Sequence, residues 1–196
     1  MVETINQDKS LAVARSEQKA VAVIEAPQQY LTFLLGGEMF ALAILNVKEI
    51  IEYGNLTEIP MMPNFIRGVI NLRGSVVPVI DMSARFGGSS SEIGRRTCIV
   101  IVEMKGAESG DAGQDIGIIV DAVSEVLEIP RGEIEPPPSF GAKIRADFIA
   151  GMGKVSGKFV IILNVQRVLS VEEMAQLSHV GANAVAPSNQ TAESVH

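Results

Sequence analysis

FIRGVINLRGSVVPVID, residues 65–81, is the stretch of sequence that decides the fold. An apolar run ends at Leu72, Arg73 and Gly74 interrupt it, and a second run rich in Val continues to Asp81. Two β-branched runs on either side of a short turn that contains Gly are typical of a β-hairpin. The stretch therefore predicts two antiparallel strands with Arg73 and Gly74 at their turn.

The same pattern returns in the second half of the chain, at residues 148–164, FIAGMGKVSGKFVIILN. In an alignment without gaps, the Phe, the Ile, both glycines and one Val coincide. An earlier block, residues 40–52 (FALAILNVKEIIE), aligns in the same way on residues 116–128 (IGIIVDAVSEVLE). Because the two blocks come in the same order in each half, the sequence predicts an internal duplication.

The duplication predicts two similar five-stranded units, barrel one at about 30–96 and barrel two at about 97–169. Neither unit is long enough to bury much apolar surface alone, so we expect them to pack as one body. Short apolar runs separated by Gly, Pro and Asn favour an all-β barrel or sandwich. The strand candidates are 30–35, 39–44, 47–51, 69–72, 75–81, 97–104, 116–120, 124–129 and 159–165.

The ends of the chain have a different composition. Residues 1–28 are polar and Ala-rich, and residues 180–196 lack an amphipathic pattern, so both are expected to be flexible tails. A closing helix is predicted at 171–178, where Ser170 and Glu173 form a capping box. The folded domain is therefore expected to span 29–179.

Composition and charge exclude several classes of function. The net charge of -7 disfavours binding to nucleic acid or to anionic lipid. No apolar run reaches the roughly 18 residues that a membrane span requires, and the first residues do not read as a signal peptide. We expect a soluble, cytoplasmic protein. Its single cysteine, Cys98, cannot form an internal disulfide.

The residues that catalysis requires are also missing from the pattern. The two histidines, His179 and His196, lie too near the end of the chain to activate a nucleophile elsewhere, and no Cys/His cluster has metal-ligand spacing. The glycines at 151–157 have the wrong spacing for a phosphate loop. The sequence predicts a protein that is not an enzyme and that has no cofactor, metal or small-molecule substrate.

Arg73 departs from the repeat. Its counterpart is Ser156, so the fold does not demand an arginine at this turn. A residue that breaks the repeat on a loop is a better functional candidate than one that obeys it. Glu49 lies on the neighbouring predicted strand, and we expect the two side chains to pair across the rim of the first barrel.

Residues 65–81 closely resemble the signature of CheW-type chemotaxis coupling proteins, in which an apolar pair, a basic residue and Gly precede N-L-R-G and V-P-V-I-D. The order of the other motifs agrees over about residues 29–178. The resemblance implies two SH3-like five-stranded barrels packed side by side, with short helical turns and a C-terminal helix. It implies an adaptor in bacterial chemotaxis signal transduction, recruited to receptor arrays. Its implied partners are the cytoplasmic tip of methyl-accepting chemoreceptors and the regulatory domain of a CheA-type histidine kinase.

The resemblance also implies where these partners bind. The receptor is expected at the groove between the barrels and at the neighbouring rim. The residues of this set are Ile44, Val47, Glu49, Ile50, Arg73, Cys98 and Val123. The kinase is expected near the hairpin turn, at Leu72 and Gly74. One alternative stays open for Ile44 and Cys98, namely that they are core residues. Another stays open for the function, namely that the chain is a CheV-like or CheA regulatory-domain-like adaptor in a non-motility pathway.

Overall fold

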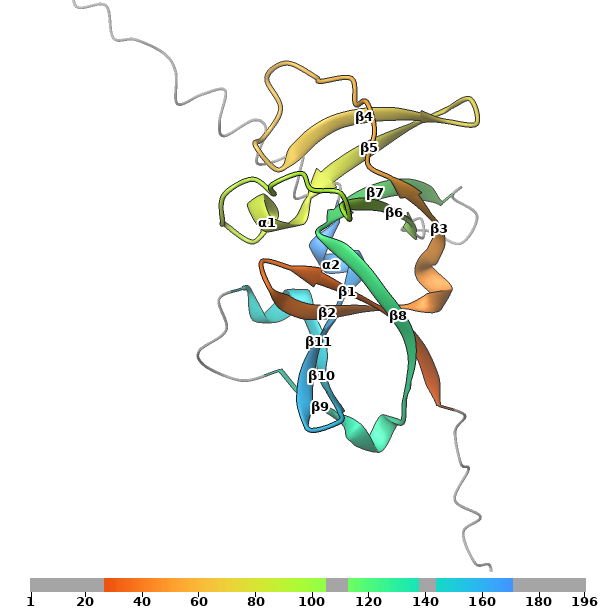
Figure 1. Ribbon diagram of the computed structural model, residues 1–196, viewed down its shortest axis with the longest axis vertical. Helices are drawn as coiled ribbons and strands as arrows, with labels where there is room; N and C mark the ends of the chain where they lie inside the picture. Colours follow the sequence, from red (N-terminus) through yellow and green to blue (C-terminus); the bar gives the residue numbers. More distant parts are fainter. Residues whose placement is uncertain (1–26, 105–112, 138–143, 171–196) are drawn as a thin grey trace, which may run out of the picture.

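The computed structural model describes residues 27–104, 113–137 and 144–170, and strands make up most of its regular structure (Figure 1). The first half of the chain forms β1 (Gln28–Leu35), β2 (Glu38–Ala43), β3 (Val47–Glu52), β4 (Ile66–Leu72) and β5 (Ser75–Asp81). The second half forms β6 (Cys98–Met104), β7 (Gln114–Val120), β8 (Ala122–Ile129), β9 (Ile134–Glu135), β10 (Ile149–Val155) and β11 (Lys158–Leu163). The predicted all-β class is confirmed.

The helices within these residues are short. The α-helices are α1 (Met82–Arg85) and α2 (Val165–Val168), and the 3-10 turns are η1 (Ile44–Asn46), η2 (Arg131–Glu133) and η3 (Ala146–Phe148). None of the described helices is long and apolar enough to cross a membrane. The predicted closing helix at 171–178 and nearly all of both predicted tails lie outside the described residues.

The strands form two sheets, each the frame of one unit. The first unit is a five-stranded sheet of order β3-β6-β7-β5-β4, and the second is a six-stranded sheet of order β8-β1-β2-β11-β10-β9. This pairing departs from the predicted division into 30–96 and 97–169, because β1 and β2 join the second unit while β6 and β7 complete the first. Only Asp121 separates β7 from β8, and the common hairpin turns need at least two residues, so the chain passes directly into the other sheet.

The duplication itself is confirmed by the registers of the strands. In the first unit β5 runs parallel to β7, with Val79 opposite Gly117; in the second β11 runs parallel to β2, with Ile162 opposite Ala41. These four residues are counterparts in the sequence repeat. The hairpins correspond too, because β4–β5 and β10–β11 carry register shifts at the same place.

The two hairpin turns share one backbone conformation. Arg73 and Gly74 have φ angles of 52° and 91°, and Ser156 and Gly157 have φ angles of 49° and 77°. Two successive residues with positive φ are typical of the turns that match the twist of paired strands. The Gly at the second position meets this demand without steric cost, as the predicted hairpins required.

Apolar side chains form three cores. One smaller core belongs to each unit and packs on one face of its sheet. The largest core is a layer shared by the two units. In β6, Ile99 and Ile101 face the core of the first unit, whereas Val100 and Val102 face the shared layer. A strand that is buried on both faces needs an unbroken apolar run, which is what β6 has. The expectation that the two units pack as one body is met by this layer.

Gly68 generates a prediction about stability. Its φ of 144° is unfavourable for any side chain, and a Cβ there would overlap the carbonyl oxygen of Thr57. Hydrogen bonds in both directions between Thr57 and Val69 hold that carbonyl in place. We expect Gly68→Ala to lower the free energy of unfolding by more than about 2 kcal/mol, measured by urea denaturation.

The matched control is Gly54→Ala, because Gly54 is exposed and a Cβ there would meet nothing within 4 Å. Its free energy of unfolding should stay within about 0.5 kcal/mol of the unaltered protein. Equal stability of the Gly68 variant and the Gly54 variant would contradict the close packing of residue 57 against β4.

Candidate partner-binding site

Arg73 and Glu49 form the ion pair that the sequence predicts. A guanidinium nitrogen of Arg73, Nη2, donates to Oε2 of Glu49 at 2.8 Å. Arg73 lies at the turn between β4 and β5, and Glu49 lies on β3. Because β3 and β4 are the opposite edges of the five-stranded sheet, the pair joins the two ends of that sheet.

The pair presents its arginine to the surroundings. The Arg73 side chain is 80% exposed, whereas that of Glu49 is 25% exposed. A guanidinium has five N–H donors, and the bond to Glu49 uses one of them. Glu49 therefore orients a planar, charged group on the surface, where it can meet an acidic or carbonyl group of a partner. Since Ser156 holds the same backbone conformation at the other turn, the fold alone does not require this arginine.

A second set of charges lies beside the pair. Lys48 Nζ lies 2.7 Å from Asp115 Oδ1 and 3.1 Å from Glu103 Oε1. The hydrogen bonds to Asp115 and then to Glu103 raise the pKa of Lys48, so its charge is retained at neutral pH and lost only as the pH rises through that raised value. A hollow of about 410 Å³ is lined by Lys48, Glu49, Leu72, Arg73, Ser75 and Asp115.

The residues predicted for the groove lie at the margin of the shared layer. Ile44, Val47, Cys98 and Val123 are half-buried and pack against that layer. Val47 lies opposite Val102 on β6, and its repeat counterpart Val123 lies opposite Phe33 on β1. Each unit therefore contributes one valine at an equivalent place. Ile44 and Cys98 are neither fully core nor fully exposed, and their receptor-binding role stays a prediction.

The remaining predicted residues differ in how much they expose. Ile50 lies on β3 and is 43% exposed. Leu72 is half-buried and packs against the core of the first unit, so it offers a partner little apolar surface. Gly74 is exposed and its N–H donates to Asn71 Oδ1 at 2.9 Å, which secures the turn. Binding roles for these residues stay predictions.

Sequence reasoning missed two exposed apolar residues beside the predicted ones. Leu45, in η1 between Ile44 and Val47, is 86% exposed, and Val76, just after the hairpin turn, is 71% exposed. A signal for Leu45 was present in the sequence, because its repeat counterpart is the polar Asp121. No comparable signal marked Val76, whose counterpart Phe159 is also apolar and 51% exposed.

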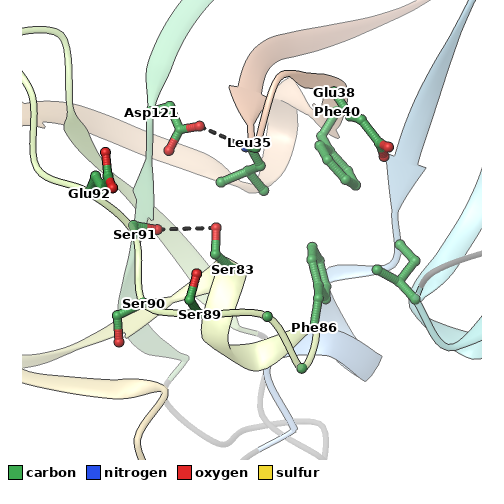
Figure 2. A pocket seen from close by; sticks show the side chains of 14 residues that line it. Leu35, Glu38, Phe40, Ser83, Phe86, Ser89, Ser90, Ser91, Glu92 and Asp121 are labelled. Carbon is green, nitrogen blue, oxygen red and sulfur yellow. Dashed lines mark hydrogen bonds between the residues drawn. The ribbon is translucent and has the colours of Figure 1, made fainter.

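A larger hollow of about 730 Å³ lies between the β1–β2 turn and the segment after α1 (Figure 2). Its polar walls are held by internal hydrogen bonds: Asp121 Oδ2 accepts from the Gly36 N–H at 2.7 Å, and the hydroxyl oxygens of Ser83 and Ser91 are hydrogen-bonded at 3.2 Å (Figure 2). Ser91 also bonds the buried carboxylate of Asp81 through both its N–H and its hydroxyl. These contacts fix the segment after α1, and we assign the hollow a structural origin.

No metal centre is visible in residues 27–104, 113–137 and 144–170, where no group of three His, Cys, Asp or Glu could hold an ion. His179 and His196 lie outside these residues. What the described surface offers is a fixed arginine, a charged hollow and a margin of apolar side chains. Such a combination suits binding to other proteins.

Comparisons with known proteins agree with this reading. A family model described as CheW-like domain matches residues 29–173. Chemotaxis protein CheW of Klebsiella aerogenes is 34% identical over 154 residues, which are 78% of this chain and 88% of that protein. Chemotaxis protein CheW of Helicobacter pylori is 30% identical over 167 residues, which are 84% of this chain and 96% of that one.

A solved structure is similar as well. The crystal structure of the scaffolding protein TtCheW from Thermoanaerobacter tengcongensis matches with a TM-score of 0.66 and 38% sequence identity. The match covers 74% of this chain and 89% of that chain. The two proteins are therefore similar in sequence as well as in fold.

The exposure of Arg73 predicts how little its ion pair with Glu49 stabilises the fold. An exposed pair contributes about 1 kcal/mol or less, because water weakens the attraction in the folded state and ordering the two side chains costs entropy. In a double-mutant cycle of Arg73→Ala and Glu49→Gln, we expect a coupling free energy below about 1 kcal/mol by urea denaturation. A coupling of several kcal/mol would make the pair structural and would remove the argument for a binding role.

Proposed function

Because the chain belongs to the CheW family, we propose that it is a non-enzymatic scaffold in bacterial chemotaxis signal transduction, coupling methyl-accepting chemoreceptors to a CheA-type histidine kinase. The observation that carries this proposal is the family match over nearly the whole described chain. The site agrees with it, because its residues suit protein contacts. The role places the protein in the cytoplasm, at receptor arrays on the membrane.

We place the receptor contact at the groove margin between the units. The half-buried Val47 and Val123 line this margin, and the exposed Leu45 projects beside them. An amphipathic helix, such as those of a receptor coiled-coil tip, binds through apolar residues spaced three and four apart laid into an apolar groove. The charge of Arg73, oriented by Glu49, would then pair with an acidic residue or a carbonyl of the same helix.

We place the kinase contact on the hairpin of the first unit. Leu72 and Gly74 shape the turn, and Val76 supplies the exposed apolar side chain next to it. β4 is an edge strand of the five-stranded sheet, and edge strands carry unpaired backbone groups suited to association. A contact of this kind is mainly apolar and depends little on the formal charges of the surface.

The receptor assignment is tested with Arg73→Ala. Loss of the guanidinium should reduce receptor-dependent kinase activation by about tenfold, because charge-assisted hydrogen bonds to the partner disappear. The melting temperature should fall by only a few degrees, since the ion pair is exposed. Both quantities are measured on the same preparations, with a receptor fragment and kinase reconstituted on the adaptor.

The control is Lys158→Ala, which removes an exposed cation from the equivalent hairpin of the second unit. It should leave activation unchanged. Normal activation and normal melting of the Arg73 variant would show that the receptor surface lies elsewhere, along Val47 and Val123. A melting temperature many degrees lower would make Arg73 a structural residue.

The kinase assignment is tested with Val76→Ser and a change of salt. Removing the exposed apolar side chain should weaken binding to an isolated kinase regulatory domain by about tenfold. Raising ionic strength from about 0.1 to 1 M, which shortens the Debye length from about 10 to 3 Å, should change the dissociation constant little. Calorimetry measures both effects.

Phe159→Ser is the comparison, because Phe159 is the equivalent exposed residue of the second unit. A larger loss of affinity for this variant than for Val76→Ser would move the kinase contact to the second unit. A steep salt dependence would contradict the apolar character of the contact.

A further inference from the structure

Arg85, the last residue of α1, carries its charge into the contact between the two units. It is only 9% exposed. Its guanidinium carbon lies 5.1 Å from the ring centroid of Phe65 and 4.8 Å from that of Phe148. Phe65 precedes β4 of the first unit and Phe148 precedes β10 of the second, and the two are repeat counterparts. One cation therefore lies over an aromatic ring of each unit.

A hydrogen bond adds direction to this contact. Arg85 Nε donates to the carbonyl oxygen of Val168 at 3.0 Å. Val168 ends α2 as Arg85 ends α1, and the two are also repeat counterparts. Counterparts touch each other only where the two repeats meet. The two counterparts contribute unlike groups at this place: Arg85 supplies a cation, and Val168 supplies a carbonyl oxygen and an apolar side chain of the shared layer.

We propose that Arg85 is a positioning residue that fixes the orientation of the two units, and with it the shape of the groove between them. The inference rests on the receptor role proposed above for that groove. Apolar contacts are non-directional, whereas a planar guanidinium stacked on two rings and bonded to a carbonyl favours one orientation of the two units.

The connection to the groove runs through the shared layer. Phe65, Phe148 and Val168 belong to the same apolar cluster against which Val47 and Val123 pack. Val47 is attached to the first unit and Val123 to the second, so a rotation of one unit against the other changes the relation between these valines. Arg85 acts on the groove through this rotation and not through contact with the receptor.

Arg145 provides a matched control on the same ring. Its guanidinium carbon lies 4.6 Å from the centroid of Phe148, on the unit to which Phe148 belongs. Its side chain is 54% exposed and its Nη2 lies 2.6 Å from Asp147 Oδ2. Replacing Arg145 removes a cation from Phe148 and leaves the contacts of Arg85 with Phe65, Phe148 and Val168 in place.

The test measures the distance between the units. Spin labels are attached to Val76→Cys and Phe159→Cys, exposed positions on the two hairpins, in a Cys98→Ala background. Pulsed electron–electron double resonance should give one narrow distribution of distances between the two labels in the otherwise unaltered protein. Arg85→Met should shift and broaden it, and Arg145→Met should leave it unchanged.

Unlabelled variants are assayed for receptor-dependent kinase activation. Arg85→Met should reduce receptor-dependent kinase activation by about tenfold, which is within the usual range of coupling between sites. Arg145→Met should leave this activation unchanged. A shifted distance with normal activation would support the orientation role of Arg85 and contradict the groove assignment of the proposed function. A folded Arg85→Met variant with unaltered distances would overturn the inference.

Arg85→Lys covers the case in which Arg85→Met does not fold. Lysine keeps the charge but lacks the planar group that stacks on both rings. We expect a shifted distance distribution for Arg85→Lys as well. Unaltered distances in a folded Arg85→Lys variant would overturn the role of the stacked guanidinium.

Discussion

The apolar layer shared by the two units is the contact on which the rest of the structure depends. It forms because β1, β2, β6 and β7 each turn one apolar face into the layer, while residues of their other face are buried in the core of one unit. Removing either unit would expose the face in the layer to water, at a cost that rises with the apolar area uncovered. The exchange of strands also makes the two units depend on each other, because each unit is completed by strands from the other half of the chain.

This arrangement determines where binding residues can lie. The interior of each sheet and the layer between them are filled, so what remains for partners is the hairpin turns, the edge strands and the margin of the layer. The Arg73–Glu49 pair lies at the first two of these, since it joins a turn to an edge strand. Val47 and Val123 lie at the third. An adaptor needs surfaces that are stable without a partner, and each of these features is anchored to a core.

The sequence allowed the hairpins to be predicted from local patterns, the duplication from a comparison of the two halves, and the Arg73–Glu49 pair from opposite charges on predicted neighbouring elements. In the structure that pair instead joins the two edges of the five-stranded sheet. It did not allow the strand exchange to be predicted. Val79 lies opposite Gly117, and the equivalent Ile162 lies opposite Ala41. Because the two halves have similar sequences, the same pairing could form within one half or between the halves, so the sequence pattern does not distinguish the two arrangements. Val76 was missed for a related reason: exposure of an apolar residue is set by how far a hairpin extends beyond its neighbours, which no pattern of residues records.

The duplication also presents a problem that the sequence solves by breaking it. Two equivalent units would offer two equivalent surfaces, and equivalent surfaces cannot discriminate between two different partners. Discrimination requires a difference in affinity, which only unlike residues at like positions supply. Arg73 against Ser156 gives one turn a charge that the other lacks, and Leu45 against Asp121 gives one crossover an exposed apolar side chain. Arg85 against Val168 differs in kind, because the arginine bonds the carbonyl oxygen of its own counterpart where the two repeats meet. Among these departures, Arg73 and Leu45 make the surfaces of the two units unlike, whereas Arg85 lies in the contact between the units.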